Sequence, residues 1–328
     1  MTAGTVRQPA QPDAEFQALV RKTYAGNPQA FTALGLRLLA GRDSPHSPVD
    51  GEALLAEATR QGDTAAWFHL GVLAAAGVAR AQCWASAWDA MRRAADGGHH
   101  GAMRQFELLA LAQIDSVRDI PDWLASPQFR AIHYSPALRA CEAFIEPAWC
   151  LHLKALAQPL LQPAQVYDFR ERQLRLDPMR SNCNAAFSIA DTDLVMQLVR
   201  ARIALTAGVP QNHLEPPEVL NYRPGEQYRL HVDFFHPSVP HFADIIRERG
   251  QRTQTLLIYL NADYAGGETD FPKLGIKFRG RCGEALLFEN VNAAGDGDMR
   301  TAHAGTPVVT GQKWLFSQWI RNQRQPVA

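Results

Sequence analysis

The segment from Asn221 to Asp233 contains the residue types best suited to chemistry in this chain. It ends in His231-x-Asp233, and in an extended strand two residues with this spacing point to the same face. An imidazole and a carboxylate presented together are two of the three ligands in the two-histidine, one-carboxylate site that holds non-haem Fe(II). The pair alone is weak evidence, because 11 His in the chain make a chance His-x-Asp common. Its interpretation therefore depends on residues further along the chain.

His303 is the candidate third ligand, because it is the only His after His241. Ten residues after it comes Lys313, which opens an otherwise apolar segment. A lysine that points inward from such a segment needs an anion, since burying an unpaired ammonium is very costly. A substrate carboxylate would satisfy this requirement.

The part of the chain after Pro217 has the period-two pattern of β-strands. Leu230 and Val232 alternate with His231 and Asp233, so one face of this strand can join a core while the other presents ligands. Short strands separated by Gly turns predict an antiparallel sandwich or jelly roll. The expected strands are Glu218 to Tyr222, Tyr228 to Asp233, Thr255 to Asn261, Ala285 to Phe288, Thr306 to Val309 and Trp314 to Ile320.

Two helical segments precede these strands. Apolar residues at helical spacing occur from Ile145 to Leu161, where Pro147 suits the first turn of a helix. The same spacing recurs from Asp191 to Leu205, which opens with aspartates that can cap a helix. We expect both helices to support the strand-rich part of the chain.

The N-terminal part of the chain repeats itself with a period of 36 residues, as Ala30, Ala66 and Ala102 show. A period of this length is typical of helix-turn-helix solenoids. The phrases Ala65-Ala66-Trp67-Phe68-His69-Leu70-Gly71 and Ala94-Ala95-Asp96-Gly97-Gly98 resemble the Sel-type branch of the tetratricopeptide-like family. The alternative is an Ala-rich pair of helical hairpins with accidental periodicity. Solenoid arrays usually present a concave face to other proteins, whereas two units can also serve only to pack on a neighbouring domain.

Composition and charge narrow the class of protein. The chain has 328 residues, 46% of them apolar, which suits a globular protein of one large or two ordinary domains. Lys plus Arg and Asp plus Glu balance at 33 each, so no global basic field would recruit nucleic acid or an anionic membrane. Five scattered Cys and no long apolar run disfavour a disulfide scaffold, a structural zinc site and a membrane span. We therefore expect a cytoplasmic protein.

These patterns predict four regions: a disordered tail at 1–26, helical repeats at 27–112, a connector at 113–143 and a catalytic domain at 144–328. The predicted fold class is α+β, in which an all-α repeat module precedes an antiparallel jelly roll with supporting helices.

From about Ile145 onward, several phrases occur in the order typical of one family. They are Tyr222-x-x-Gly225-x-Gln227-Tyr228-x-x-His231-x-Asp233, Arg252-x-x-Thr255-x-x-x-Tyr259-Leu260-Asn261, Gly266-Gly267-Glu268-Thr269-x-Phe271-Pro272, His303-x-Gly305-x-Pro307-Val308 and Gly311-x-Lys313-Trp314. With this series, the chain resembles the prolyl 4-hydroxylase type of Fe(II)- and 2-oxoglutarate-dependent dioxygenase. The resemblance covers some 180 residues, from about Ile145 to the C-terminus.

The resemblance implies a double-stranded β-helix in which His231, Asp233 and His303 hold iron. Members of this family use O2 and 2-oxoglutarate, release succinate and CO2, and hydroxylate a substrate. Ascorbate is a candidate further cofactor. The protein's part in such a reaction is to leave metal positions open and to keep the site dry.

The resemblance also assigns roles around the metal. Lys313 would pair with the distal carboxylate of 2-oxoglutarate, helped by the hydroxyls of Tyr222 and Thr269. Arg252 and Trp319 match family positions near the peptide and are candidate substrate contacts. Lys313, where the nucleic-acid demethylase branch usually has Arg, disfavours that branch.

We therefore expect a hydroxylase that acts on a prolyl residue of a protein or peptide, with the helical repeats recruiting the substrate. One alternative is a hydroxylase of small molecules or free amino acids. Another is a repeat-based adaptor or oxygen-sensing scaffold with little turnover. The sequence leaves the substrate and the oligomeric state open.

Overall fold

The computed structural model describes residues 13–41, 43–125, 127–168, 173–176 and 179–327. The chain divides into two compact units. One comprises 126–186 and 203–325, and we call it the oxygenase unit. The other, the helical unit, comprises the described residues before 126 together with 187–202 and 326–327. Among the described residues, no helix is both long and apolar enough to cross a membrane.

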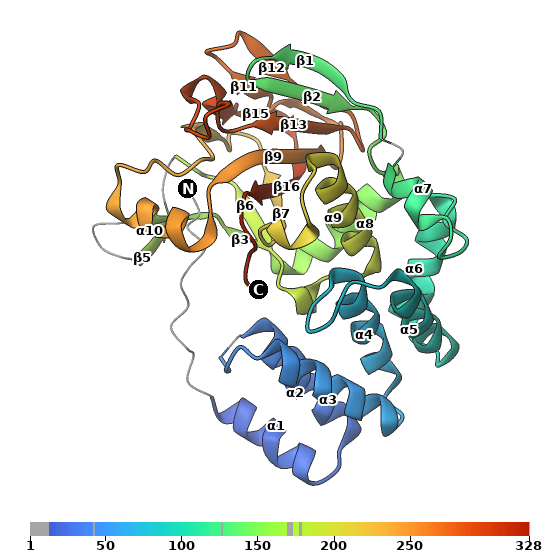
Figure 1. The fold of residues 1–328 in the computed structure, drawn as a ribbon. Helices are drawn as coiled ribbons and strands as arrows, with labels where there is room; N and C mark the ends of the chain where they lie inside the picture. The colour runs from blue at the N-terminus through green and yellow to red at the C-terminus, as the bar shows by residue number, and fades with distance from the viewer. Residues whose placement is uncertain (1–12, 42, 126, 169–172, 177–178, 328) are drawn as a thin grey trace. The chain divides into compact units, whose positions relative to one another are not determined.

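The helical unit is built from paired helices whose caps repeat with the sequence period. Asn27, Asp63 and His99 are 36 residues apart, and each side chain accepts a backbone N–H of the helix after it. Gly41 and Gly77 end two of these helices in the left-handed conformation. The helices are α1 Ala14–Tyr24, α2 Pro28–Ala40, α3 Pro48–Arg60, α4 Thr64–Ala76, α5 Trp84–Asp96, α6 His100–Leu111 and α7 Ile120–Ala125 (Figure 1).

Small residues let the helices of each pair approach closely. A Cβ on Gly35 of α2 would lie 2.9 Å from the carbonyl oxygen of Gly51 on α3. One repeat later, a Cβ on Gly71 of α4 would lie 3.1 Å from the carbonyl oxygen of Ala87 on α5. Since real Cβ atoms essentially never come closer than 3.0 Å to such an atom, the first contact requires glycine. The predicted helical repeats are confirmed.

The expected disordered tail is wrong for residues 14–24, which form α1. Asp13 caps this helix by accepting the N–H of Phe16 at 2.7 Å. Arg37 of α2 also pairs with Asp13 at 2.8 Å and with Glu15 at 3.1 Å. Composition alone could not show that a distant arginine holds this segment. The rest of the predicted tail, up to residue 12, lies outside the described residues.

The oxygenase unit is an antiparallel double sheet. The larger sheet has the order β1-β2-β13-β9-β16-β7-β6-β3, and the smaller has the order β12-β11-β14-β8. The bounds of the larger are β1 Arg130–Tyr134, β2 Ala137–Cys141, β13 Ala285–Glu289, β9 Arg252–Tyr259, β16 Lys313–Arg321, β7 Glu218–Tyr222, β6 Cys183–Ala186 and β3 Gln162–Pro163. Those of the smaller are β12 Ile276–Phe278, β11 Thr269–Phe271, β14 His303–Gly305 and β8 Tyr228–His231.

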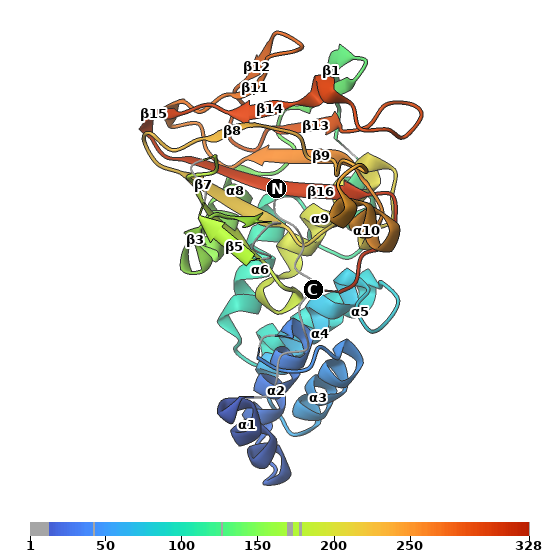
Figure 2. The ribbon, with the colours of Figure 1, turned by 90° about the vertical axis from the view of Figure 1, so that its left-hand side faces the viewer.

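The two sheets enclose one hydrophobic core. Leu257, Leu286 and Leu315 of the larger sheet belong to the same buried cluster as Phe271 and Phe278 of the smaller one. Figure 2 shows the strands of the smaller sheet lying over β9 and β16. This arrangement confirms the predicted jelly roll, and it brings β8 and β14 together at the inner face.

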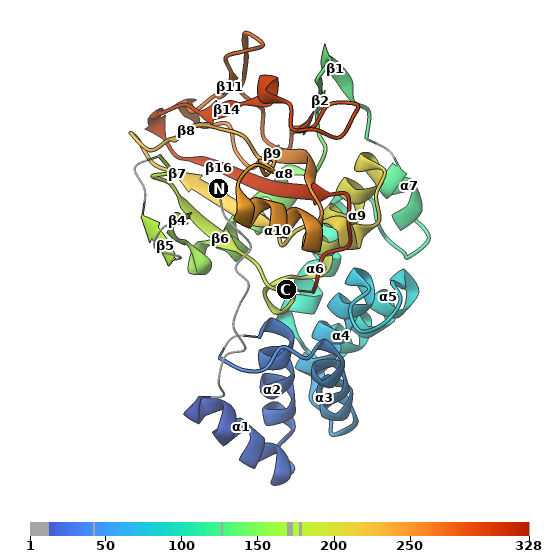
Figure 3. The same cartoon turned by 60° about the vertical axis from the view of Figure 1, so that its left-hand side comes forward.

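The remaining elements of this unit are short connections and helices. Two further strand pairs are β10 Tyr264–Gly266 with β15 Val308–Gly311, and β4 Gln165–Asp168 with β5 Gln173–Leu176. The helices are α8 Pro147–Ala157, the last residues of α9 Leu194–Ala207, whose part up to residue 202 belongs to the helical unit, and α10 Pro240–Arg249, which leads into β9 (Figure 3). Both helices expected from the sequence are present as α8 and α9, and Pro147 is the first residue of α8.

The predicted connector at 113–143 is wrong over its second half, where β1 and β2 form a hairpin that extends the larger sheet. Ala140 of β2 pairs with Leu286 of β13, and Leu138 and Ala140 are fully buried. The prolines of this region suggested a connector, but Pro136 stands in the turn between the two strands.

Candidate metal centre

His231 and His303 lie side by side on neighbouring strands of the smaller sheet. They are direct partners in the antiparallel pairing of β8 with β14, and their ring centroids are 4.4 Å apart. Asp233 lies just beyond the end of β8. Its Oδ1 is 3.7 Å from His231 Nε2, and its Oδ2 is 3.8 Å from His303 Nε2. One ligand atom from each of the three residues lies within 4.8 Å of the others.

Backbone carbonyls orient both imidazole rings. His231 Nδ1 lies 2.8 Å from the carbonyl oxygen of Arg229, and His303 Nδ1 lies 3.0 Å from that of Thr301. A carbonyl only accepts, so each Nδ1 carries the proton and each Nε2 keeps its lone pair for the site. Ligating histidines in metal sites are held in this way.

The charge states also suit a metal ion. Burial, together with the neighbouring His303, holds the pKa of His231 well below its ordinary value of 6.5, so this ring is neutral. Burial raises the pKa of Asp233, but the two histidines, Arg252 and a hydrogen bond from Thr255 outweigh it and leave that pKa below 3.8. Imidazole nitrogens and a carboxylate are the donor set of non-haem Fe(II) sites. The three residues therefore fit this metal.

The three side chains line one pocket that is open to solvent. Four residues that the sequence assigned to co-substrate or substrate also line it: Lys313, Tyr222, Thr269 and Trp319. Arg252 is not among the lining residues. The other lining residues are Arg180, Leu220, Tyr228, Leu257, Gly305, Leu315 and Ser317.

Lys313 brings a buried positive charge into the pocket. Its side chain is 1% exposed, and its Nζ donates to the carbonyl oxygen of Gly267 at 2.7 Å. Burial lowers its pKa from the ordinary value of 10.5 to about 7. The negative charge of Glu268 raises this pKa, but by less than burial lowers it. A ligand carboxylate would supply the missing counter-charge.

Aromatic and hydroxyl groups surround this ammonium. Lys313 on β16 is the cross-strand partner of Tyr222 on β7, and its Nζ lies 5.3 Å from the Tyr222 ring. Tyr259 of β9 lies on another side at 5.5 Å, and its hydroxyl shares a 2.6 Å hydrogen bond with Thr269 Oγ1. The sequence alone gave no role to Tyr259, although this residue stands in the same motif as Thr255.

Comparisons with known proteins agree with this site. The profile of the 2OG-Fe(II) oxygenase superfamily matches residues 217–321. Prolyl 4-hydroxylase 1 of Arabidopsis thaliana is 30% identical over 206 residues, which cover 58% of this chain and 71% of that protein. The chain belongs to the prolyl 4-hydroxylase family. It is a 2-oxoglutarate-dependent dioxygenase, as the resemblance predicted.

Other relatives match parts of the chain. Prolyl 4-hydroxylase subunit alpha-1 of Rattus norvegicus is 34% identical over 53% of this chain, and the chain spans about a third of its length, 32%. The viral collagen prolyl hydroxylase of Paramecium bursaria Chlorella virus-1 is 25% identical, with a TM-score of 0.44, over 56% of this chain and 95% of its own. A Sel1 repeat protein of Oxalobacter formigenes is 26% identical, with a TM-score of 0.27, over 28% of this chain and 27% of its own.

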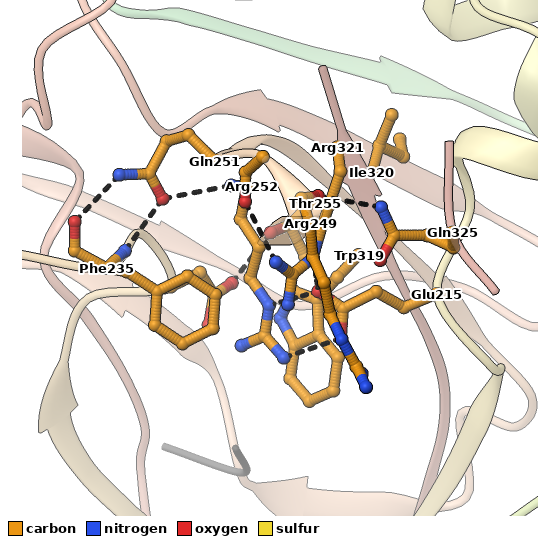
Figure 4. A network of polar contacts seen from close by, with 12 residues as sticks. Glu215, Phe235, Arg249, Gln251, Arg252, Thr255, Trp319, Ile320, Arg321 and Gln325 are labelled. Atoms are coloured by element: carbon orange, nitrogen blue, oxygen red, sulfur yellow. Dashed lines mark hydrogen bonds and ion pairs between the residues drawn. The ribbon is translucent and has the colours of Figure 1, made fainter. Parts of the chain in front are cut away.

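Arg252 lies in a buried ion-pair network rather than at the pocket surface (Figure 4). Its Nε and Nη2 donate to the carboxylate of Glu215 at 2.6 and 2.7 Å, and Arg321 Nε donates to the same carboxylate at 2.6 Å. Its guanidinium carbon lies 3.9 Å from the ring centroid of Trp319, which does line the pocket. The expected direct contact of Arg252 with substrate is therefore replaced by a supporting role behind Trp319.

Arg180 is a pocket residue that the sequence did not reveal. Its side chain is buried, and its Nη2 pairs with Glu218 Oε2 at 3.0 Å. Its Nε and Nη1 are buried without a hydrogen-bond partner among the described residues. Arg180 reaches the pocket because it forms an isolated bridge with Tyr228 of β8, a pairing that no local pattern predicts. It therefore lines the same pocket as the candidate metal ligands.

Proposed function

We propose that this enzyme hydroxylates a prolyl residue of a protein or peptide, with Fe(II) held by His231, Asp233 and His303. Lys313 binds the distal carboxylate of 2-oxoglutarate beside Tyr222. The observation that carries the proposal is one pocket that contains both three residues able to hold a metal ion and a buried ammonium with no carboxylate partner among the described residues.

Each residue has a definite task in this proposal. Bound Fe(II) supplies the activation of O2 that couples decarboxylation of 2-oxoglutarate to hydroxylation. His231 and His303 present their Nε2 atoms because Arg229 and Thr301 hold the opposite side of each ring. The apolar lining residues and Trp319 limit the access of water to the site.

The choice of a prolyl substrate rests on the relatives, which are named as prolyl 4-hydroxylases. The unsatisfied donors of Arg180 favour a substrate that brings carbonyl oxygens, as a peptide backbone does. The helical unit is proposed to recruit that protein or peptide, because helical repeat arrays commonly bind other proteins. Ascorbate is proposed as a further cofactor that sustains turnover. A reducing cytoplasm is the proposed compartment, because all five cysteines are free thiols.

Anaerobic addition of Fe(II) and 2-oxoglutarate tests the metal centre. The wild-type protein should show the weak visible charge-transfer band of the chelate, and His231→Ala should abolish it. His236→Ala is the matched control, since His236 is exposed and its ring bonds only to Ser238 among the described contacts. A folded wild-type protein without the band would contradict the proposal.

Incubation with peptides tests the substrate. We expect succinate release and addition of one oxygen atom with Pro-containing peptides, but not with the same peptides in which Ala replaces Pro. Turnover of free amino acids, with none of peptides, would favour a small-molecule hydroxylase instead.

A further inference from the structure

Two buried side chains hold the carboxylate of Asp233 from behind. Thr255 of β9 donates its hydroxyl proton to Asp233 Oδ2 at 2.7 Å. Asn290, the residue after β13, donates its side-chain amide to Thr255 Oγ1 at 2.9 Å. Thr255 is 1% exposed and Asn290 is fully buried, so water cannot replace either group. Neither side chain belongs to the pocket lining.

The direction of these hydrogen bonds is fixed by proton counting. The hydroxyl of Thr255 has one proton, and the ionised carboxylate of a ligating Asp233 can only accept. Thr255 therefore gives its proton to Asp233 and must receive one from Asn290. The amide nitrogen of Asn290 consequently faces Thr255, and its Oδ1 is left buried without a hydrogen-bond partner among the described residues. Leaving this carbonyl oxygen unsatisfied destabilises the folded protein, and the orientation of Thr255 must offset that cost.

Two hydrogen bonds hold the backbone of Asn290 in place. Its backbone N–H donates to the carbonyl oxygen of Thr253 on β9 at 2.8 Å, and its carbonyl oxygen accepts the N–H of Asp298 at 2.9 Å. The amide therefore cannot follow a movement of Asp233. The two strands β9 and β13 hold the Asn290–Thr255 pair at a fixed position behind β8.

These contacts affect which carboxylate oxygen of Asp233 can bind a metal. The hydrogen bond from Thr255 occupies Oδ2, whereas Oδ1 has no hydrogen-bond donor among the described residues. A carboxylate that binds through both oxygens takes one more metal position than a carboxylate that binds through one. The proposed reaction needs open positions for both 2-oxoglutarate and O2.

We propose that Thr255 and Asn290 are positioning residues that keep Asp233 a one-oxygen ligand through Oδ1. This inference rests on the proposed function of the metal centre, since it assigns the way in which one of its ligands is held. Loss of the hydrogen bond frees Oδ2 to bind the metal, which weakens the binding of 2-oxoglutarate more than a loss of packing would.

Thr255→Val tests this proposal, because valine keeps the shape of threonine and removes its hydroxyl. Thr255→Ser keeps the hydroxyl and is the conservative rescue. Thr253→Val is the matched control, since Thr253 stands on the same strand and, among the described residues, its side chain makes only a 3.5 Å hydrogen bond to the carbonyl oxygen of Ile320. Asn290→Leu removes the second donor without touching Thr255. Thermal unfolding of each apo protein shows which variants are folded.

The readouts are two dissociation constants measured without O2: that for Fe(II), and that for 2-oxoglutarate from the charge-transfer band. Loss of a residue that orients a ligand commonly costs about 10- to 100-fold in metal affinity or activity. We expect Thr255→Val to raise the dissociation constant for 2-oxoglutarate by about tenfold or more. Thr255→Ser and Thr253→Val should remain within about twofold of wild type, and Asn290→Leu should lie between the extremes.

Equal dissociation constants for wild type, Thr255→Val and Asn290→Leu would overturn the proposal. If Thr255→Val does not fold, Asn290→Leu is the deciding variant. An Asn290→Leu protein that binds Fe(II) and 2-oxoglutarate as tightly as wild type would likewise exclude the positioning role of Asn290 and Thr255. A wild-type protein that binds neither Fe(II) nor 2-oxoglutarate would instead refute the proposed function. The two failures are therefore distinguishable.

Discussion

Replacing Lys313 with Met should stabilise the ligand-free protein and remove its affinity for 2-oxoglutarate. Burial lowers the pKa of Lys313 from 10.5 to about 7. One pKa unit corresponds to about 1.4 kcal/mol, so the buried ammonium costs the folded state on the order of 4 kcal/mol near neutral pH. The variant loses the hydrogen bond to Gly267, which is worth about 1 kcal/mol. We therefore expect a net gain in the free energy of unfolding of up to about 3 kcal/mol.

This gain should depend on pH in a defined direction. The folded protein releases the Lys313 proton near pH 7, whereas the unfolded chain keeps it up to pH 10.5. Between these values the unfolded state binds more protons, so the stability of the wild type rises with pH. The penalty is fully present below about pH 7 and disappears above about pH 10.5. The advantage of Lys313→Met should shrink by about 2–3 kcal/mol between about pH 6 and about pH 9.

Urea unfolding at both pH values, with and without 2-oxoglutarate, measures these effects. A co-substrate concentration about 100 times its dissociation constant should stabilise the wild type by about 2.7 kcal/mol and leave Lys313→Met unchanged. Lys277→Met is the control, because Lys277 is exposed on β12. A Lys313→Met variant that is no more stable than wild type at about pH 6, or that 2-oxoglutarate stabilises as much as wild type, would contradict this prediction.

Other contacts in the oxygenase unit support three further predictions. Tyr259→Phe should raise the dissociation constant for 2-oxoglutarate several-fold, because it removes the hydroxyl that shares a hydrogen bond with the pocket residue Thr269. Tyr264→Phe should leave this constant unchanged, since the buried hydroxyl of Tyr264 has no hydrogen-bond partner among the described residues. Glu215→Gln should lower the free energy of unfolding by about 3–5 kcal/mol in urea, because it leaves two buried arginines uncompensated. The reaction of Cys282 with iodoacetamide should have a midpoint near pH 7, because a hydrogen bond from the Cys150 thiol lowers the pKa of Cys282 to about 7. Cys183 should react only at a higher pH, because burial raises the pKa of its thiol. The first prediction is contradicted if the two tyrosine variants have equal effects. The second is contradicted if Glu215→Gln leaves the urea unfolding curve unchanged, and the third if Cys282 and Cys183 react with the same midpoint.

Much of the candidate metal centre could be predicted from the sequence, because its proposed ligands obey a local spacing rule. His231 and Asp233 are two residues apart, and although β8 ends at His231, Asp233 Oδ1 still lies 3.7 Å from His231 Nε2. His303 and Lys313 stand in short phrases that keep their order along the chain. The structure brings all four to one pocket through the pairing of β8 with β14 and of β7 with β16.

The residues that the sequence missed act through contacts between distant segments. Asn290 reaches Thr255 across 35 positions, and Arg252 meets Glu215 across 37. No spacing or periodicity encodes such contacts, so the burial of Arg252 could not be foreseen. The hairpin β1–β2 was missed for a related reason, because its pairing partner β13 begins only at Ala285, far along the chain.

The most direct test of the account uses isotopically heavy O2. Wild-type enzyme, Fe(II), 2-oxoglutarate and a Pro-containing peptide should yield a peptide that carries one heavy oxygen atom on proline, and succinate that carries another. His231→Ala should yield neither product. A hydroxylated peptide without the heavy isotope, or succinate release that is unchanged in His231→Ala, would contradict the account.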